Sequence, residues 1–418
     1  MKKKFLIFLF LLTLKTFPGS AQLIATLEVK FNNEKNELTI PVHVDLDAIT
    51  LFPDSILQLV EVRGTSRSPI AYQVETNGQR NLYWLIEPGI NTNKKRVYEL
   101  VKGRPNENST HITASKDNGF LTISNNNKNL LRYNYKTIYP PQGIDTVYRR
   151  SGFIHPLWSP RGQELTRINA PDHYHHWGLW NPWTEVLFEN DSVDFWNLAR
   201  KQGTVQFGKF LSITSGNVFA DYKALHEHVV FKKNGENKIA INEVQSVRIY
   251  QPAINSNYYI ADVFIQLNCA SESPVLLLEY RYGGLGMRAT QEWNKDNSTV
   301  ITSEGKPRKE ADGSKARWCM VQGSVNNDYA GIIFMSYPTN YNYPEPLRVW
   351  PEEMNNRGDV FINFSPTKNM NWLLSPGKEY LLKYRLVVFN DSFPKEKAEA
   401  GWQNFAYPPA ITVKLPKK

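Results

Sequence analysis

The chain consists almost entirely of short runs in which apolar and polar residues alternate, and this pattern restricts it to a β-sheet fold. Alternation with a period of two places the apolar side chains on one face of a strand. Clusters of Asn, Gly, Pro and Asp separate the runs, as is typical of turns between strands. The predicted strands are 24–31, 38–44, 57–62, 82–86, 120–124, 130–138, 205–213, 218–231, 275–282, 331–337 and 380–389.

Helical periodicity is nearly absent, with at most two short helices at 198–202 and 395–402. The chain therefore belongs to the all-β class, with paired sheets burying their apolar faces against each other. A polar stretch at 102–118, rich in Gly, Asn, Ser and Lys, is the best domain boundary. We expect a small N-terminal β-sandwich domain over 22–112 and a large antiparallel sandwich, the catalytic domain, over 113–418.

Residues 1–21 have the pattern of a signal peptide: three lysines, an apolar run over 5–14 and small residues up to Ala21. The apolar run is too short to span a bilayer, and no later segment is long and apolar enough to do so. No cysteine follows Ala21 to carry a lipid. These features predict a soluble protein that is periplasmic or secreted.

The formal net charge is +9, and four lysines within the first 21 residues would leave with the signal peptide. A basic exported protein favours anionic ligands such as acidic polysaccharide. The basic residues are dispersed along the chain, so nucleic acid is not expected as a partner. Cys269 and Cys319 are the only cysteines. They could form a disulfide, but the fold does not depend on a disulfide framework.

The densest chemical feature is the segment Asp172-His173-Tyr174-His175-His176-Trp177-Gly178, which we call the histidine loop. Four of the eight histidines lie between 155 and 176, and five of the eleven tryptophans lie between 158 and 196. Imidazole is the side chain best suited to proton transfer or metal binding near neutral pH. The candidate catalytic residues are His173, His175, Tyr174, His176 and His155.

In an extended loop, His173 and His175 would share one face, and His176 and Asp172 would point the other way. One or two of these imidazoles could simply hydrogen-bond to the backbone. A divalent metal could be held by the three loop histidines with Asp172 or His155. The helical spacing of zinc proteases is missing, however, so we assign no metal ligand and expect no cofactor.

Substrate-binding residues are expected around the histidine loop and around the Gly-Gly turn that follows 275–282. Arg281 or Arg288 could bind a carboxylate through two parallel hydrogen bonds, although a salt bridge with Glu279 inside the sandwich explains them equally well. Trp177 and Trp180 could stack against sugar rings. The full set of candidates is Arg281, Arg288, Glu279, Arg150, Trp177 and Trp180.

Three further polar residues have simpler explanations. His226 and His228 alternate along a predicted strand and fit solvent-facing positions on a sheet. Asp194, beside Phe195 and Trp196, could be a second acid but is better explained as a loop cap.

Several motifs occur in the order of a known family: YRRSGFIHPLWSPRG at 148–162, DHYHHWG at 172–178, DFW at 194–196, YGGLGMR at 282–288, ARWC at 316–319 and YRLVV at 384–388. Over about 115–390 the chain resembles the PmoA-like family of bacterial proteins. The resemblance implies a galactose-mutarotase-like supersandwich and a role in carbohydrate use. The chain departs from the family's loop at Tyr174, where the family has Pro, and at Trp177, where it has Arg.

These residues favour β-elimination on uronate-containing oligosaccharides, by a lyase or a dehydratase that leaves a 4,5-unsaturated uronate. Such a reaction needs a cation or hydrogen-bond donors at the carboxylate, together with a base and an acid. His173, His175 or Tyr174 would carry protons, and Arg281 or Arg288 would hold the carboxylate. A glycoside hydrolase or epimerase on the same fold and a non-catalytic glycan-binding protein remain alternatives. Oligomeric state stays open.

Overall fold

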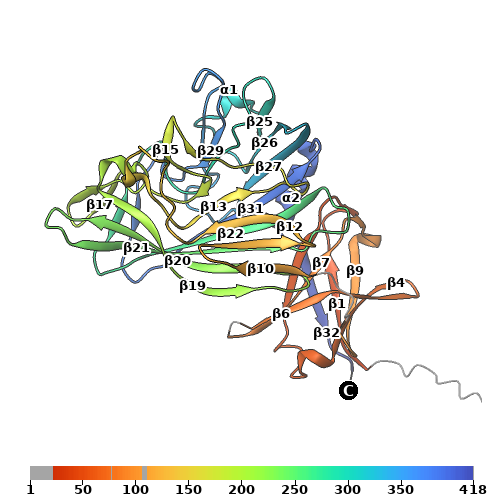
Figure 1. The fold of residues 1–418 in the computed structure, drawn as a ribbon. Coiled ribbons are helices and arrows are strands. Elements are labelled where there is room, and N and C mark those ends of the chain that lie inside the picture. The colour runs from red at the N-terminus through yellow and green to blue at the C-terminus, as the bar shows by residue number, and fades with distance from the viewer. Residues whose placement is uncertain (1–21, 77, 106–110, 418) are drawn as a thin grey trace, which may run out of the picture.

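The structure is a computed structural model that describes residues 22–76, 78–105 and 111–417 (Figure 1). Strands dominate these residues, which confirms the all-β prediction. Within the described ranges, no helix has both the length and the apolar character needed to cross a membrane. The signal peptide predicted over 1–21 lies outside the described residues.

The N-terminal unit is a small sandwich, drawn in red and orange in Figure 1, whose two sheets have the orders β32-β1-β9-β4-β5 and β3-β7-β6. Leu27, Leu59, Trp84 and Leu100 are fully buried between them. The strands are β1 (Leu23–Lys30), β3 (Ile40–Asp45), β4 (Leu57–Arg63), β5 (Ser66–Ile70), β6 (Tyr72–Thr76), β7 (Arg80–Ile86), β9 (Lys95–Lys102) and β32 (Ala410–Lys414), with a short pair β2 (Lys35–Asn36) and β8 (Gly89–Ile90) beside them.

The large unit contains two eight-stranded antiparallel sheets. The first, which we call the long sheet, has the order β19 (Gly203–Thr214), β20 (Phe219–Phe231), β21 (Asn237–Tyr250), β22 (Tyr258–Cys269), β31 (Tyr380–Asn390), β27 (Asp328–Ser336), β26 (Trp318–Val325) and β25 (Ser298–Thr302). The second, the site sheet, has the order β10 (Ile112–Lys116), β11 (Phe120–Asn125), β12 (Lys128–Asn134), β13 (Phe153–Leu157), β16 (Leu179–Trp180), β24 (Gly286–Arg288), β29 (Phe361–Phe364) and β28 (Leu347–Val349).

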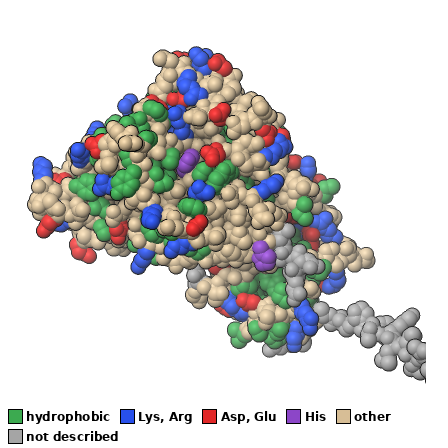
Figure 2. Space-filling view, viewed as in Figure 1, with side chains coloured by type: hydrophobic (Ala, Val, Ile, Leu, Met, Phe, Trp, Pro, Cys, Tyr) green, Lys and Arg blue, Asp and Glu red, His purple; other side chains and the backbone are tan. Residues whose placement is uncertain are grey.

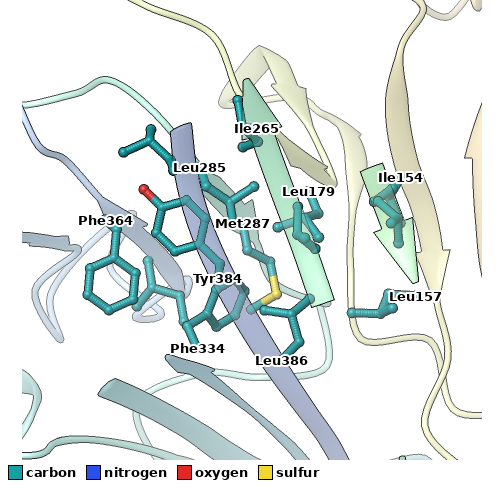
Figure 3. Packing of buried hydrophobic residues seen from close by; sticks show 14 of the residues in the cluster. Ile154, Leu157, Leu179, Ile265, Leu285, Met287, Phe334, Phe364, Tyr384 and Leu386 are labelled. Carbon is teal, nitrogen blue, oxygen red and sulfur yellow. The ribbon is translucent and has the colours of Figure 1, made fainter. Parts of the chain in front are cut away.

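The main core fills the space between these sheets, where Ile154, Leu179 and Met287 of the site sheet meet Phe334 and Leu386 of the long sheet (Figure 3). Because side chains alternate along a strand, the neighbours of the first three residues point to the opposite face. That outer face carries Phe153, Trp180, Arg288 and Phe361, and it is where the histidine loop lies.

The remaining elements surround the two sheets. A four-stranded sheet has the order β18 (Asp191–Val193), β17 (Val186–Phe188), β23 (Val275–Leu277) and β30 (Trp372–Leu374). A separate hairpin joins β14 (Ile168–Ala170) to β15 (His173–Trp177). The helices are α1 (Arg308–Ala311) and α2 (Lys395–Ala406), with 3-10 turns η1 (Asp54–Ile56), η2 (Thr92–Lys94), η3 (Thr146–Tyr148) and η4 (Leu198–Arg200).

Most predicted strands occur with ends shifted by a few residues, and the helix predicted at 395–402 is α2. The strand predicted at 275–282 is too long, because β23 ends at Leu277 and the chain then bends toward Gly283 and Gly284. The segment at 198–202 forms only the 3-10 turn η4. Cys269 and Cys319 are buried free thiols, so the disulfide that they could have formed is absent here.

Candidate functional site

The histidine loop forms β15 and the turn that precedes it, at the end of the large unit away from the N-terminal unit (Figure 1). Ile168 pairs with Trp177 and Ala170 pairs with His173, so Tyr174, His175 and His176 together oppose the single residue Asn169. This irregular pairing interrupts the strict alternation of side chains along β15.

As a result, the three imidazoles converge. The ring centroids of His173 and His176 lie 4.7 Å apart, as do those of His175 and His176, and those of His173 and His175 lie 5.2 Å apart. One nitrogen from each ring lies within 4.8 Å of the other two. The expectation that His176 points away from the other two histidines is wrong, because it assumed a regular strand.

Asp172 orients this cluster from its edge. Its Oδ2 accepts a hydrogen bond from Nδ1 of His173 at 2.7 Å, so the Nε2 lone pair of His173 remains available. Nη2 of Arg288 donates to the same carboxylate at 3.1 Å while its Nη1 lies 2.9 Å from Oδ2 as an ion pair, and Asn355 donates to it at 2.9 Å. Burial alone would raise the pKa of Asp172, but the hydrogen bond from His173 and the charge of Arg288 lower it overall.

The other two histidines lie deeper. His176 is fully buried and His175 is half-buried. Burial, followed by the neighbouring imidazoles, holds the pKa of His176 well below its usual range and lowers that of His175 to about 3. Both rings are therefore neutral near neutral pH. Nδ1 of His176 is buried and has no hydrogen-bond partner among the described residues.

A group of buried aromatic side chains, which we call the aromatic wall, packs against the cluster: Phe153, Trp177, Trp180, Trp196, Trp350 and Phe361. The ring of His176 lies 5.1 to 5.3 Å from those of Trp180, Trp350 and Phe361, and His173 packs against Trp350 at 4.8 Å. Trp177 and Trp180 are 0 % exposed. They belong to the interior of this wall, so the prediction that they offer stacking surfaces for sugars does not agree with their burial.

The candidate arginines occupy three different environments. Arg288 is 1 % exposed and its charge is paired with Asp172 and with Asp359, the latter at 3.0 Å, so a substrate carboxylate does not reach it in this arrangement. Arg150 is buried and lines a separate cavity of about 410 Å³. Arg281 is exposed and stacks over Tyr282, whose ring contacts Trp196 and Phe361 of the aromatic wall. Of the three, Arg281 remains accessible.

Three more candidates do not join the cluster. Glu279 is exposed, and within the described part of the chain it forms no salt bridge with an arginine, so the buried ion pair considered for it is wrong. His155 lies on β13, where Nδ1 contacts Oγ1 of Thr166 at 3.0 Å. Tyr174 is half-buried with its ring 5.8 Å from that of Tyr148.

A second histidine group lies inside the sandwich. His226 and His228 are 1 % and 0 % exposed, so their expected solvent-facing positions are wrong. Their rings bind the two oxygens of Glu243 at 3.1 and 2.9 Å, and the hydroxyl of Tyr133 lies 2.6 Å from Nε2 of His226. Glu243 was not predicted as part of a buried group. It occupies the same alternating positions of β21 as the buried apolar residues, and this could have indicated a buried carboxylate.

Asp194 caps its loop, as expected, because one carboxylate oxygen accepts the backbone N–H groups of Trp196 and Asn197 at 2.8 and 2.7 Å. On the face drawn in Figure 2, basic and acidic side chains are interspersed and a histidine side chain reaches the surface of the large unit.

A family model described as a family of unknown function (DUF6807) matches residues 121–403. The matched segment is more than half of the chain and contains the histidine loop together with Arg288, Asn355 and Asp359. No curated protein matches the chain.

Proposed function

The chain belongs to a family of unknown function (DUF6807), and we propose that it is a carbohydrate-active enzyme that acts on uronate-containing oligosaccharides by β-elimination. It is a lyase if the group leaving C4 is a sugar and a dehydratase if that group is water. The finer resemblance to the PmoA-like family, with its supersandwich and its role in carbohydrate use, is part of this proposal.

The observation that carries the proposal is that three carboxylates of the segment 172–194 are already engaged, whereas each loop imidazole keeps a ring nitrogen with no hydrogen bond to a described residue. Glu185 pairs with Arg200 at 2.8 Å, Asp194 caps a loop, and Asp172 is held by Arg288 and Asn355. Hydrolysis of a glycosidic bond by the usual route requires two free carboxylates on opposite sides of that bond. An elimination does not.

In the proposed reaction, a base removes the proton from C5 of the uronate, the electron pair forms the C4–C5 double bond, and the bond from C4 to oxygen breaks. The departing oxygen takes up a proton, so atoms and electrons balance without any oxidant. His173, His175 or Tyr174 of the histidine loop supplies the base that takes the C5 proton and the acid that protonates the departing oxygen.

The proton at C5 becomes acidic only when the carboxylate beside it is neutralised. Arg288 does not serve here because Asp172 and Asp359 occupy it. Arg281 is accessible above Tyr282, at 5.5 Å from the ring, and is the protein cation that best fits this role. Arg281 is favoured over Arg288 because it is exposed, whereas Arg288 is buried and donates to two carboxylates.

The test is the ultraviolet absorbance of the unsaturated product when the purified protein is mixed with oligosaccharides of defined uronates. We expect absorbance to appear with the wild type and to fall at least about 100-fold in rate in His173→Ala and His175→Ala, which remove groups of the proton-transfer site. His43→Ala, an exposed histidine of the N-terminal unit, is the matched control and should keep the wild-type rate.

Three results would overturn the proposal. The first is an absence of new absorbance with every acidic glycan. The second is shortened fragments without a double bond, which would indicate a hydrolase. The third is tight glycan binding without turnover, which would indicate a binding protein.

A further inference from the structure

We propose that His173, His175 and His176 bind one divalent transition-metal ion, with Zn²⁺ the best chemical match. This inference deepens the proposed function, because the ion would act on the same uronate substrate. The binding of the ion itself does not depend on that function.

The three histidine rings bring one nitrogen each toward a common point. One nitrogen of each ring lies within 4.8 Å of the other two. Two imidazole nitrogens on one tetrahedral zinc ion, each at about 2.0 to 2.1 Å, lie roughly 3.4 Å apart. A contraction of up to about 1.4 Å, within the reach of side-chain rotations, would therefore complete the coordination.

Two of the ring nitrogens have lone pairs that no described residue binds. Asp172 accepts a hydrogen bond from Nδ1 of His173, which leaves the Nε2 lone pair of that ring free to bind an ion. Nδ1 of His176 is completely buried and unpartnered among the described residues. A buried polar atom without a partner costs free energy unless a ligand or water satisfies it. A metal ion would satisfy it with a full coordinate bond.

The residues that hydrogen-bond to the loop histidines also match those found around metal ligands. Histidine ligands of metals commonly donate their second N–H to a carboxylate that is itself hydrogen-bonded. Asp172 has this role for His173, and Arg288 and Asn355 fix Asp172 in turn. The second group of histidines differs, because both of its rings bind Glu243, and among the described residues only the loop histidines bring three ligand atoms together.

The aspartates around the cluster are already balanced by arginines, so a bound cation would make the site attractive to an anionic substrate. Asp172 and Asp359 are balanced by Arg288 and Arg357, the latter lying 3.1 Å from Asp359. A divalent ion would add net positive charge. The side chain of His173 is 26 % exposed while His176 is buried, so the open side of the ion would face solvent.

Three imidazoles with an open fourth position are the arrangement of catalytic rather than structural zinc sites. A uronate carboxylate oxygen could occupy that position, and the ion would neutralise the carboxylate in the way that Arg288 does not. Zinc can expand to five ligands, so a hydroxide held beside the carboxylate would accept the proton from C5 and become water.

The experiment is calorimetric titration of the full chain with Zn²⁺, after purification without a polyhistidine tag and treatment with a chelator. We expect one Zn²⁺ per chain with a Kd tighter than about 1 µM. His173→Ala and His175→Ala should weaken binding more than about 100-fold, and Asp172→Asn about 10- to 100-fold. His43→Ala should bind as the wild type does.

Visible absorbance of bound Co²⁺ gives a second readout that does not depend on activity, and circular dichroism checks that each variant is folded. Failure of the chelator-treated wild type to take up Zn²⁺ would overturn the inference. Equal uptake by folded His173→Ala and His175→Ala proteins would also overturn it.

Two outcomes separate this inference from the proposed function. Stoichiometric Zn²⁺ binding with no unsaturated product from any uronate would support the metal site and overturn the elimination. Undiminished elimination by the metal-free protein would support the elimination and overturn the part given to the ion.

Discussion

The two histidine groups of this protein illustrate how the surroundings of a residue decide its role. In the interior, Glu243 accepts hydrogen bonds from both His226 and His228, and Nδ1 of His228, which has no partner among the described residues, is closed off in the core. On the outer face of the site sheet, the three loop histidines have one carboxylate partner between them, and His173 is partly exposed. A lone pair beside an accessible surface can bind a ligand, whereas one enclosed in the core cannot.

The density of the loop histidines made them the candidate site in the sequence, but nothing in the sequence could rank the arginines. Arg281 and Arg288 stand seven positions apart in one motif, and only their contacts distinguish the exposed side chain from the one held by two carboxylates. The partners Asn355 and Asp359 lie far along the chain in an ordinary polar stretch. Nothing local to them indicates that they meet Asp172.

Glu345 supports a prediction about stability and pH. It is fully buried and accepts hydrogen bonds from Ser336, from Asn340 at 2.9 Å and from Tyr384 at 2.6 Å. Burial raises its pKa from 4.5 to about 7. The folded state therefore holds this proton more tightly than the unfolded state, and the associated stability is complete below pH 4.5 and lost as pH rises through 7.

Glu345→Gln mimics the neutral acid and should remove this dependence. Relative to wild type, its free energy of unfolding should gain up to about 3 kcal/mol between pH 4.5 and pH 8. Urea unfolding of both proteins at pH 5 and pH 8 measures the difference. Equal pH dependence in the two proteins would show that Glu345 is ionised throughout this range.

At the scale of elements, the hairpin of β14 and β15 depends on a close approach to the site sheet. Gly178 has a φ of +65°, and a Cβ there would lie 2.4 Å from the carbonyl oxygen of Ile154 on β13. Only glycine allows the backbone to come so near. The position of the histidine cluster over the aromatic wall follows from this contact.

Gly178→Ala should therefore displace the hairpin, lower stability by more than about 2 kcal/mol and weaken Zn²⁺ binding. Gly162→Ala is the matched control, since Gly162 also has a positive φ, of +94°, but has open space around its Cβ position. It should cost only about 1 to 2 kcal/mol and leave Zn²⁺ binding intact. Thermal unfolding and zinc titration of both variants provide the comparison, and similar losses in the two would contradict the packing argument.

Two of the strands that the sequence did not reveal, β21 and β22, lack a clear alternation of apolar and polar residues. β21 carries Asn242, Glu243 and Gln245 among its apolar residues, and the last two are buried. Such polar residues interrupt the apolar pattern, yet partners on neighbouring strands satisfy them. β22 lies between β21 and β31 and is covered on both faces for half its length, so its alternation is weak.

At the scale of the whole molecule, the last strand closes the first unit. β32 pairs with β1 from Thr26 opposite Lys414 to Lys30 opposite Ala410, so the N-terminal sheet contains both ends of the described chain. Helix α2 precedes it and packs on the long sheet, with Nε1 of Trp402 donating to the carbonyl of Ser336 at 2.9 Å. Residues far apart in sequence thus join the two units.

Removal of residues 408–418 should expose β1 as a sheet edge and destabilise the N-terminal unit by roughly 1 to 2 kcal/mol, the contribution of partly buried Ile411. Removal of only 415–418 retains β32 and should leave stability unchanged. Limited proteolysis between β1 and β9, followed by mass spectrometry, reports the difference. Identical cleavage of the two shortened proteins would contradict a stabilising role for β32.

The sequence by itself determined the all-β class, the position of most strands and the loop in which the chemistry is concentrated, because alternation and residue density are local properties. The tertiary structure alone decided that three imidazoles meet at one point, that Arg288 is occupied while Arg281 is accessible, and that β32 belongs to the N-terminal sheet. These features depend on an irregular strand pairing and on contacts between distant segments. No local pattern encodes them, since the free energy that selects them arises only when those segments pack together.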